Sequence, residues 1–164
     1  PYQEEYRSNT LKRIGAFWGF HRDLVNKTEQ QDSEEENSSL LQDLKNWTSE
    51  DHWLFVILQD RTDVGFVHLQ KIGPIVMQLE DIFVQPPLRG RGIATAAIAQ
   101  AEALCRQMPG IEAVTLQVVP RNEAALRLYH KLGYDTLSLV TLRKELGPNP
   151  RRRRLRLRGL TFRF

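Results

Sequence analysis

The order of apolar and polar residues predicts that the chain begins with helices. In residues 4–25 the apolar side chains recur every three or four positions, at Leu11, Ile14, Phe17, Trp18 and Leu24. That spacing is typical of an amphipathic helix. Residues 28–39 (TEQQDSEEENSS) contain no apolar side chain and predict a mobile surface loop. We expect Ser38 or Ser39 to cap a short helix that continues to Trp47.

Three apolar segments follow, and their composition is typical of strands. They cover residues 52–60 (HWLFVILQD), 63–72 (DVGFVHLQKI) and 75–84 (IVMQLEDIFV). Short turn-forming sequences separate them, Asp-Arg-Thr-Asp at 60–63 and Gly-Pro at 73–74. This arrangement predicts an antiparallel meander.

The second half of the chain alternates between helices and strands. An alanine-rich helix is expected to run from the Arg-Gly-Arg-Gly sequence to about Met108, where Pro109 and Gly110 stop it. A strand at 113–119 (AVTLQVV), a helix at 122–132 capped by Asn122 and a strand at 136–146 (TLSLVTLRKEL) complete the pattern. The order predicts an α/β (α+β) fold with a mixed sheet.

Composition limits the class of protein. The 164 residues, 41% of them hydrophobic, suit one globular domain. The single cysteine, Cys105, excludes an internal disulfide and is interpreted as packing in its helix; no Cys-x-x-Cys or His-Glu-x-x-His pattern predicts a metal site. No apolar run approaches the ~20 residues that span a bilayer, and the first ten residues are too polar for a signal sequence. We expect a soluble, cytoplasmic protein without a metal or a membrane partner.

Charge is unevenly distributed along the chain. Residues 151–164 hold seven arginines and no acid, so the other 150 residues carry 16 basic and 20 acidic side chains, a net charge of −4. An acidic body argues against a broad nucleic-acid surface. The apolar residues of the tail change phase at Gly159, where a bulge or turn would return them to one face. We interpret the tail as a basic C-terminal strand of the same domain as residues 1–150, with its arginines in solvent; binding of nucleic acid or acidic lipid is the alternative.

The Arg-Gly-Arg-Gly turn before the alanine-rich helix carries the first chemical signal. The nucleotide P-loop pattern is absent, and the dinucleotide fingerprint fails because Thr95 stands where the third glycine would be. Glycines allow a tight turn whose N–H groups converge at a helix start, where unsatisfied donors and the helix dipole attract anions. Arg89 and Arg91 would add positive charge for a diphosphate. An ordinary tight turn is the alternative interpretation.

Two motifs resemble those of the GNAT superfamily of acetyl-CoA-dependent N-acetyltransferases. The family's cofactor motif [RQ]-x-x-G-x-[GA] is met by Arg89, Gly92 and Ala94, between a strand and a helix. The family's second motif, N-x-x-A-x-x-L-Y-x-x-x-G-[FY], is met by Asn122, Ala125, Leu128, Tyr129, Gly133 and Tyr134. The resemblance covers about residues 53–146. Because the family opens with a strand, we expect that first strand to be truncated or absent here.

The resemblance implies a fold and a set of contacts with acetyl-CoA. The fold would be a mostly antiparallel sheet flanked by helices, with a splayed strand pair that holds CoA and an extra C-terminal strand. The loop would cradle the pyrophosphate, and backbone groups of the 75–84 strand would pair with the pantetheine arm and polarise the thioester carbonyl. The implied cofactor-binding residues are Ile82, Phe83, Val84, Arg89, Gly90, Arg91, Gly92, Ile93, Ala94, Asn122 and Tyr129. Tyr129 would also protonate the departing thiolate, unless it is merely a packed aromatic of its helix.

The acceptor amine needs a group that takes its proton. A free alkylamine has a pKa of about 10 and arrives charged. Strand alternation places Gln78, Glu80 and Ile82 on one face and Leu79, Asp81 and Phe83 on the other. Glu80 also matches the acidic residue of the similar LED-x-F-V segment in polyamine N-acetyltransferases, so it is our candidate base; Asp81, His68 or a relaying water are the alternatives.

The expected reaction is direct acetyl transfer to a primary amine in a ternary complex. The acidic body favours a small cationic substrate such as a polyamine or an aminoglycoside. A peptide or protein amine, and an inactive CoA-binding or interaction module, are the alternatives. The sequence does not decide whether the protein forms a homodimer.

Overall fold

The computed structural model describes residues 2–25, 33–144, 146–147, 153–157 and 159–163. The chain divides into two compact units, Pro1–Gln117 and Val118–Phe164, which are taken in turn.

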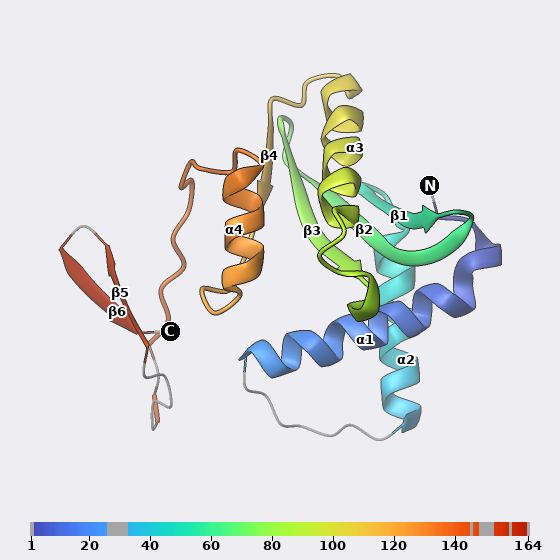
Figure 1. Cartoon of the computed structure of the whole chain (residues 1–164), viewed down its shortest axis with the longest axis horizontal. Coiled ribbons are helices and arrows are strands. Elements are labelled where there is room, and N and C mark those ends of the chain that lie inside the picture. Colours follow the sequence, from blue (N-terminus) through green and yellow to red (C-terminus); the bar gives the residue numbers. More distant parts are fainter. Residues whose placement is uncertain (1, 26–32, 145, 148–152, 158, 164) are drawn as a thin grey trace. The chain divides into compact units, whose positions relative to one another are not determined.

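The first unit is built around a four-stranded sheet of order β1-β2-β3-β4 (Figure 1). β1 (His52–Gln59), β2 (Thr62–Ile72) and β3 (Val76–Val84) are antiparallel neighbours, so the predicted meander is confirmed. Asp60 and Arg61 link β1 to β2 with φ values of 50° and 63°. Positive φ at both turn residues suits the right-handed twist of a tight hairpin.

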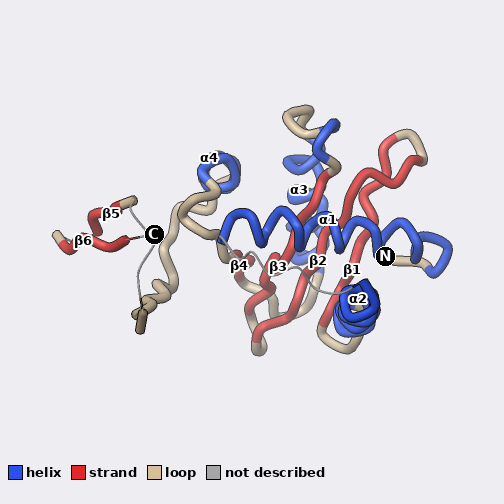
Figure 2. The backbone as a smooth tube through the Cα atoms, turned by 90° about the horizontal axis from the view of Figure 1, so that it is seen from below, coloured by secondary structure: helices blue, strands red, loops and turns tan. Residues whose placement is uncertain are grey.

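Helices cover both faces of this sheet (Figure 2). α1 (Arg7–Val25), which a 3-10 turn at Glu4–Tyr6 precedes, lies on one face with α2 (Ser33–Trp47), and α3 (Ile93–Gln107) lies on the other. β2 is accordingly buried without interruption from Asp63 to Leu69. The amphipathic first helix and the alanine-rich helix are both confirmed.

The predicted start of α2 was wrong. The helix begins at Ser33, five positions before Ser38, so Ser38 and Ser39 lie inside it. The sequence at 34–36 is Glu-Glu-Glu, and glutamate combines good helix propensity with a favourable charge near a helix N-terminus. Residues 33–39 are therefore helical although they contain no apolar side chain. Residues 28–32 of the predicted loop lie outside the described residues.

The main core lies between the sheet and the first two helices. Its buried members are Ile14, Leu44, Trp47, Leu54, Phe66 and Phe83. Aromatic rings dominate it: the centroids of Trp47 and Phe66 are 5.4 Å apart and those of Phe66 and Phe83 are 6.0 Å apart. On the other face α3 buries Ile98, Ala101 and Cys105. Phe17 of α1 also lies edge-on to Phe66, at a centroid distance of 5.9 Å. Aromatic pairs contribute beyond the area that they bury, so these contacts help to hold α1 and α2 on this face of the sheet.

The last strand of the sheet is short and parallel to its neighbour. β4 (Ala113–Leu116) pairs with β3 only from Val76 to Leu79. It ends three residues before the predicted limit at 119. The pairing stops just before Glu80, so the remainder of β3, up to Val84, has no partner on its β4 side among the described strands; we call this unpaired segment the splayed part of β3.

The second unit contains α4 (Glu123–Lys131) and a hairpin of two strands, β5 (Arg154–Leu157) and β6 (Leu160–Arg163). The side chain of Asn122 accepts a hydrogen bond from the Ala125 N–H, and Gly133 follows the helix with φ 95°, so the predicted cap and stop are confirmed.

Two predictions for the second unit were wrong. No strand forms between 135 and 144, and the side chains of Leu137 and Leu139 there are 76% and 77% exposed. Alternation favours a strand only where a neighbour supplies hydrogen bonds, and the segment pairs with none of the described strands. The tail forms a hairpin rather than one strand: Gly159, with φ 83°, makes the turn that was expected as one of two possibilities. That the tail shares a domain with residues 1–150 stays a prediction.

Among the helices that the structure describes, none combines the length and the apolar character needed to cross a membrane.

Candidate functional site

The loop after β3 leads into α3 through two glycines in left-handed conformations. A 3-10 turn at Pro86–Leu88 is followed by Gly90 with φ 76° and by Gly92 with φ 79°, the residue that precedes α3. A Cβ added at either glycine would meet no atom within 4 Å. The first turn of a helix leaves N–H groups without intrahelical partners, so this open helix start suits an anion.

Arg89 is engaged inside the first unit. Its Nε donates to the carbonyl oxygen of Val84 at 2.9 Å. Its guanidinium carbon lies 4.8 Å from the ring centroid of Phe20 and 5.5 Å from that of Phe83. These contacts tie the end of β3 to α1 and give Arg89 a structural role that the sequence did not suggest. Arg91 is exposed in the same loop, and its predicted contact with a diphosphate stays a prediction.

Glu80 lies in a β-bulge. His68 of β2 pairs with Asp81 and Leu69 pairs with Leu79, so Glu80 is an extra residue without a partner on β2. An extra residue interrupts the alternation of side chains along a strand. The predicted separation of Glu80 and Asp81 onto opposite faces was therefore wrong.

Two histidines link Asp81, at the bulge, to β1. Nδ1 of His68 lies 3.0 Å from Oδ2 of Asp81, and Nε2 of His68 lies 2.9 Å from Nδ1 of His52. His68 is 2% exposed and stacks on Trp47, with ring centroids 4.7 Å apart. The three polar side chains form a hydrogen-bonded chain from β3 to the start of β1. His52 was not among the predicted site residues, because only the strand register brings it to His68.

The environment of Glu80 favours its protonated form. Burial raises the pKa of the Glu80 carboxyl, and the charge of Asp81 raises it further. His68 and the hydrogen bond from Gln78, at 2.7 Å, oppose the shift. A carboxyl group with a raised pKa accepts a proton more readily than an ordinary glutamate, which suits a general base.

The splayed part of β3 offers backbone groups beside this bulge. Ile82, Phe83 and Val84 pair with β2 on one side, whereas the pairing with β4 ends at Leu79. The side chains of Phe83 and Val84 are buried. The side of this segment away from β2 resembles the edge of a sheet, which can pair with an extended polar ligand.

The residues of the second motif belong to the second unit. Asn122 caps α4 by accepting a hydrogen bond from the Ala125 N–H, and its predicted contact with the cofactor stays a prediction. Tyr129 is half-buried, and its ring lies edge-on to Tyr134 at a centroid distance of 6.0 Å. Tyr129 thus has the packing contact expected of a helix aromatic, and its role as an acid stays a prediction.

Cys105 does not belong to the candidate site. Its side chain is buried under α3, and burial raises the pKa of the thiol. A thiol that resists deprotonation is a poor nucleophile. This agrees with the interpretation of Cys105 as packing.

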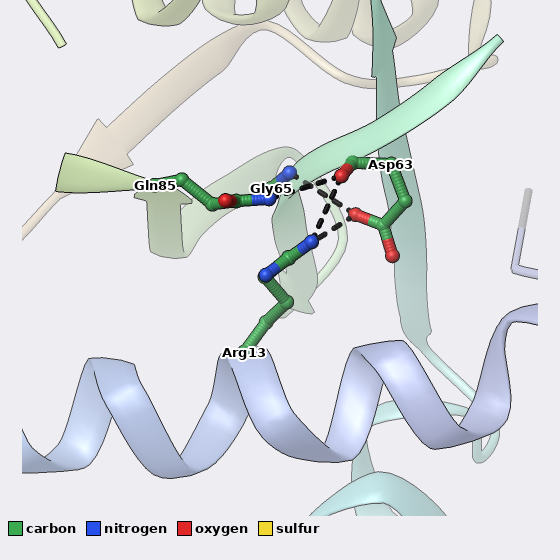
Figure 3. Close-up of polar contacts among 4 residues, drawn as sticks. All are labelled: Arg13, Asp63, Gly65 and Gln85. Carbon is green, nitrogen blue, oxygen red and sulfur yellow. Dashed lines mark hydrogen bonds and ion pairs between the residues drawn. The ribbon is translucent and has the colours of Figure 1, made fainter. Parts of the chain in front are cut away.

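A second polar cluster joins α1 to the start of β2 and to the residue that follows β3 (Figure 3). Arg13 Nη2 donates to the carbonyl oxygen of Asp63 at 2.8 Å, and the Gln85 amide donates to the same oxygen at 3.1 Å. Asp63 Oδ1 accepts from the Gly65 N–H at 3.2 Å. Gln85 directly follows β3, so this cluster fixes the start of the glycine loop relative to β2 and α1. The sequence carries no signal for a contact between positions 13 and 63.

Comparisons with known proteins agree with this geometry. The model of the acetyltransferase (GNAT) family matches residues 19–134. An acetyltransferase of Pectobacterium atrosepticum, ECA0875, is 42% identical over 65 residues, which cover 38% of this chain and 44% of that protein. MJ1207 of Methanocaldococcus jannaschii, named as an uncharacterized N-acetyltransferase, is 37% identical over 114 residues, 58% of this chain and 49% of that protein. The chain thus spans about half the length of the curated relatives it matches.

Solved structures show the same fold. The aminoglycoside 6'-N-acetyltransferase AAC(6')-Ig of Acinetobacter haemolyticus superposes with a TM-score of 0.64 at 18% identity, and the match covers 90% of this chain and 97% of that one. At this identity the likeness concerns the fold alone.

Proposed function

Because this chain belongs to the acetyltransferase (GNAT) family, we propose that it transfers an acetyl group from acetyl-CoA to a primary amine of a small cationic molecule. The observation that carries the proposal is the conjunction, within the first unit, of three features of β3 and its loop. They are the open helix start at Gly92, the splayed edge from Ile82 to Val84 and the half-buried carboxyl of Glu80 at the bulge.

The co-substrate suits the first two features. A diphosphate needs several donors within a short arc, and a left-handed glycine turn before a helix provides them with open space at both glycines. An extended amide-containing arm needs a strand edge, which β3 offers beyond Leu79. One N–H in that edge would polarise the thioester carbonyl, as an oxyanion site does.

Glu80 supplies the proton acceptor in this proposal. The ammonium group of the substrate loses a proton to Glu80, directly or through a water, and the neutral nitrogen attacks the thioester carbonyl. The carbon–sulfur bond then breaks and the thiolate takes up a proton, which we assign to the Tyr129 hydroxyl on the strength of the sequence motif. As the amide forms, the attacking nitrogen loses its second proton, which restores the Tyr129 hydroxyl, and Glu80 releases its own proton to solvent, so that one proton is released per turnover.

The class of substrate follows from charge. Residues 1–150 carry a net charge of −4, which attracts cations. One structural neighbour is named as an aminoglycoside 6'-N-acetyltransferase, which supports including aminoglycosides among the first amines tested.

A thiol-release assay tests this proposal. Acetyl-CoA is incubated with the protein and a panel of polyamines, aminoglycosides, amino acids and lysine peptides, and the free thiol of CoA is followed. We expect amine-dependent release that is fastest with polycationic small molecules. Faster release with lysine peptides would overturn the substrate class, and no release with any amine would overturn the activity.

A further inference from the structure

We propose that Asp81, His68 and His52 form a positioning chain that holds a negative charge beside Glu80 and so makes Glu80 the proton-accepting carboxylate of the bulge. The inference rests on the proposed function and assigns to that site three residues that do not themselves touch the substrate.

The first support is the continuity of the chain. Asp81 Oδ2 lies 3.0 Å from His68 Nδ1, and His68 Nε2 lies 2.9 Å from His52 Nδ1. Both distances are normal for hydrogen bonds between ring nitrogens and polar partners. The three side chains come from three adjacent strands, so the sheet register fixes their order.

The second support is the set of proton positions that the chain requires. A carboxylate has acceptor atoms only, so His68 donates through Nδ1 to Asp81. Nε2 of a neutral His68 is then an acceptor, and His52 donates to it through Nδ1. Burial is the largest cause that lowers the pKa of His52, which favours the neutral His52 ring that this pattern needs. In this pattern His52 donates to His68 and His68 donates to Asp81, so both hydrogen bonds run in the direction of Asp81.

The third support is the burial of the central ring. His68 is 2% exposed, and its ring lies nearly parallel to those of Trp47 and His52, with centroid distances of 4.7 Å and 5.1 Å. A ring held in this way keeps its orientation and cannot reach a substrate in solvent. His68 therefore acts through Asp81. Its place resembles that of a group that orients a catalytic partner by hydrogen bonding.

The consequence for Glu80 follows from the charges around it. Burial and then Asp81, its neighbour along β3, raise the pKa of Glu80, whereas His68 of β2 and the hydrogen bond from Gln78 lower it. From α2, Asp43 interacts with Asp81 and accepts a hydrogen bond from the Trp18 indole at 2.8 Å. Two carboxylates at one bulge do not ionise equally easily. We place the negative charge on Asp81, which accepts the hydrogen bond from His68, and the proton taken from the amine on Glu80.

The test measures the protonation of Glu80 in the protein without substrate. Carboxyl carbons of glutamate are labelled with ¹³C, the Glu80 signal is assigned by its loss in Glu80→Gln, and its titration is followed by NMR. We expect Asp81→Asn to lower the pH at which Glu80 titrates, because the charge that favours its protonated form is gone. An unchanged or raised midpoint in Asp81→Asn would overturn the inference.

A pair of substitutions at His68 tests the role of the ring. His68→Asn keeps an N–H donor near the position of Nδ1, whereas His68→Leu removes it at similar size. Both variants lose the imidazole and its own effect on the pKa of Glu80, so the difference between them isolates the donor, and we expect the Glu80 midpoint in His68→Leu to lie below that in His68→Asn. Equal midpoints in both variants would show that the donor to Asp81 is not what matters. Asp43→Asn removes an acid from the same face of the sheet and should leave the midpoint unchanged. Because Asp81→Asn removes no bulk, the test does not depend on whether His68→Leu folds.

Kinetics then connects the chain to the reaction. In the pH profile of kcat/KM with the best amine of the panel, the acidic limb of Asp81→Asn should lie at lower pH than that of the parent. An acidic limb at the same pH would mean that Glu80 is tuned but is not the base. The NMR titration needs no turnover, so absence of acetyl transfer would overturn the proposed function without deciding the inference on Asp81.

Discussion

Arg13 of α1 binds Asp63 at two points: Nη2 donates to its backbone carbonyl at 2.8 Å, and Nε lies 3.3 Å from its side-chain Oδ1 (Figure 3). The side chain of Asp63 is only 4% exposed, and its Oδ2 atom is buried with no hydrogen-bond partner among the described residues. The carboxylate therefore depends on Arg13 for its neutralising charge.

Replacing Arg13 should destabilise the fold. Arg13→Met keeps the apolar stem and leaves a buried charge without a partner, a change that costs about 3–5 kcal/mol. Arg7→Met is the matched control on the same helix, because Arg7 pairs with Glu4 at an exposed site and should change stability by at most about 1 kcal/mol. Urea unfolding followed by tryptophan fluorescence measures both. Equal losses in the two variants would contradict the importance of the buried pair.

Gly92 should be required for binding of CoA. Gly92→Val places a side chain in the open space before α3, where the diphosphate is expected to approach the backbone. Positive φ adds a strain of about 1–2 kcal/mol whatever the ligand. Gly73→Val is the control for strain, since Gly73 has φ 67°, open space and a position in the β2–β3 turn. Calorimetry with CoA should find lost affinity in Gly92→Val alone; parental affinity there would exclude the loop as the diphosphate site.

The Tyr129 hydroxyl should matter for turnover and not for binding. Tyr129→Phe keeps the ring that packs edge-on against Tyr134 and removes the proposed proton donor. We expect kcat to fall by about 10²-fold, as for a lost general acid, with CoA affinity retained. Tyr134→Phe removes a hydroxyl from the other ring of the same pair and should retain the parental kcat. If both variants turn over like the parent, Tyr129 is a packing residue.

Glu80→Gln should reduce activity in a manner that depends on pH. The substitution is nearly isosteric and removes the base, so only substrate that is already neutral can react. The residual rate should therefore rise with pH and follow the titration of the amine, whose pKa is about 10. A pH profile of kcat/KM decides this. A residual profile parallel to that of the parent would move the base to Asp81 or to a water.

The same substitution should raise stability at neutral pH. The pKa of Glu80 is raised in the folded state by burial and by Asp81, so the stability associated with the protonated form is present at low pH and is lost as pH rises through the folded-state pKa. Glutamine does not ionise and avoids this loss. The difference in Tm between Glu80→Gln and the parent should grow from acidic to neutral pH. A difference that shrinks over this range would contradict the raised pKa.

The sequence by itself determined the elements that depend on local signals. The three strands of the meander follow from β-rich segments with turn residues between them. The cap and the stop of α4 follow from Asn122 and Gly133, and the turn before α3 follows from glycines that adopt positive φ. The same local motifs were sufficient to suggest the family, because they describe a backbone shape that a few residue types can adopt.

The tertiary structure decided how these elements meet. Glu80 is the extra residue of a bulge that arises only when β3 pairs with β2. Simple alternation along β3 had therefore wrongly placed Glu80 and Asp81 on opposite faces of the sheet. The contact between His52 and His68 and the contact between Arg13 and Asp63 join positions 16 and 50 residues apart. Strand 136–146 was predicted from alternation and failed over its described residues because no neighbour pairs with it there. Periodicity specifies which face of an element is apolar, whereas register, bulges and long-range ion pairs depend on the partner against which that face packs.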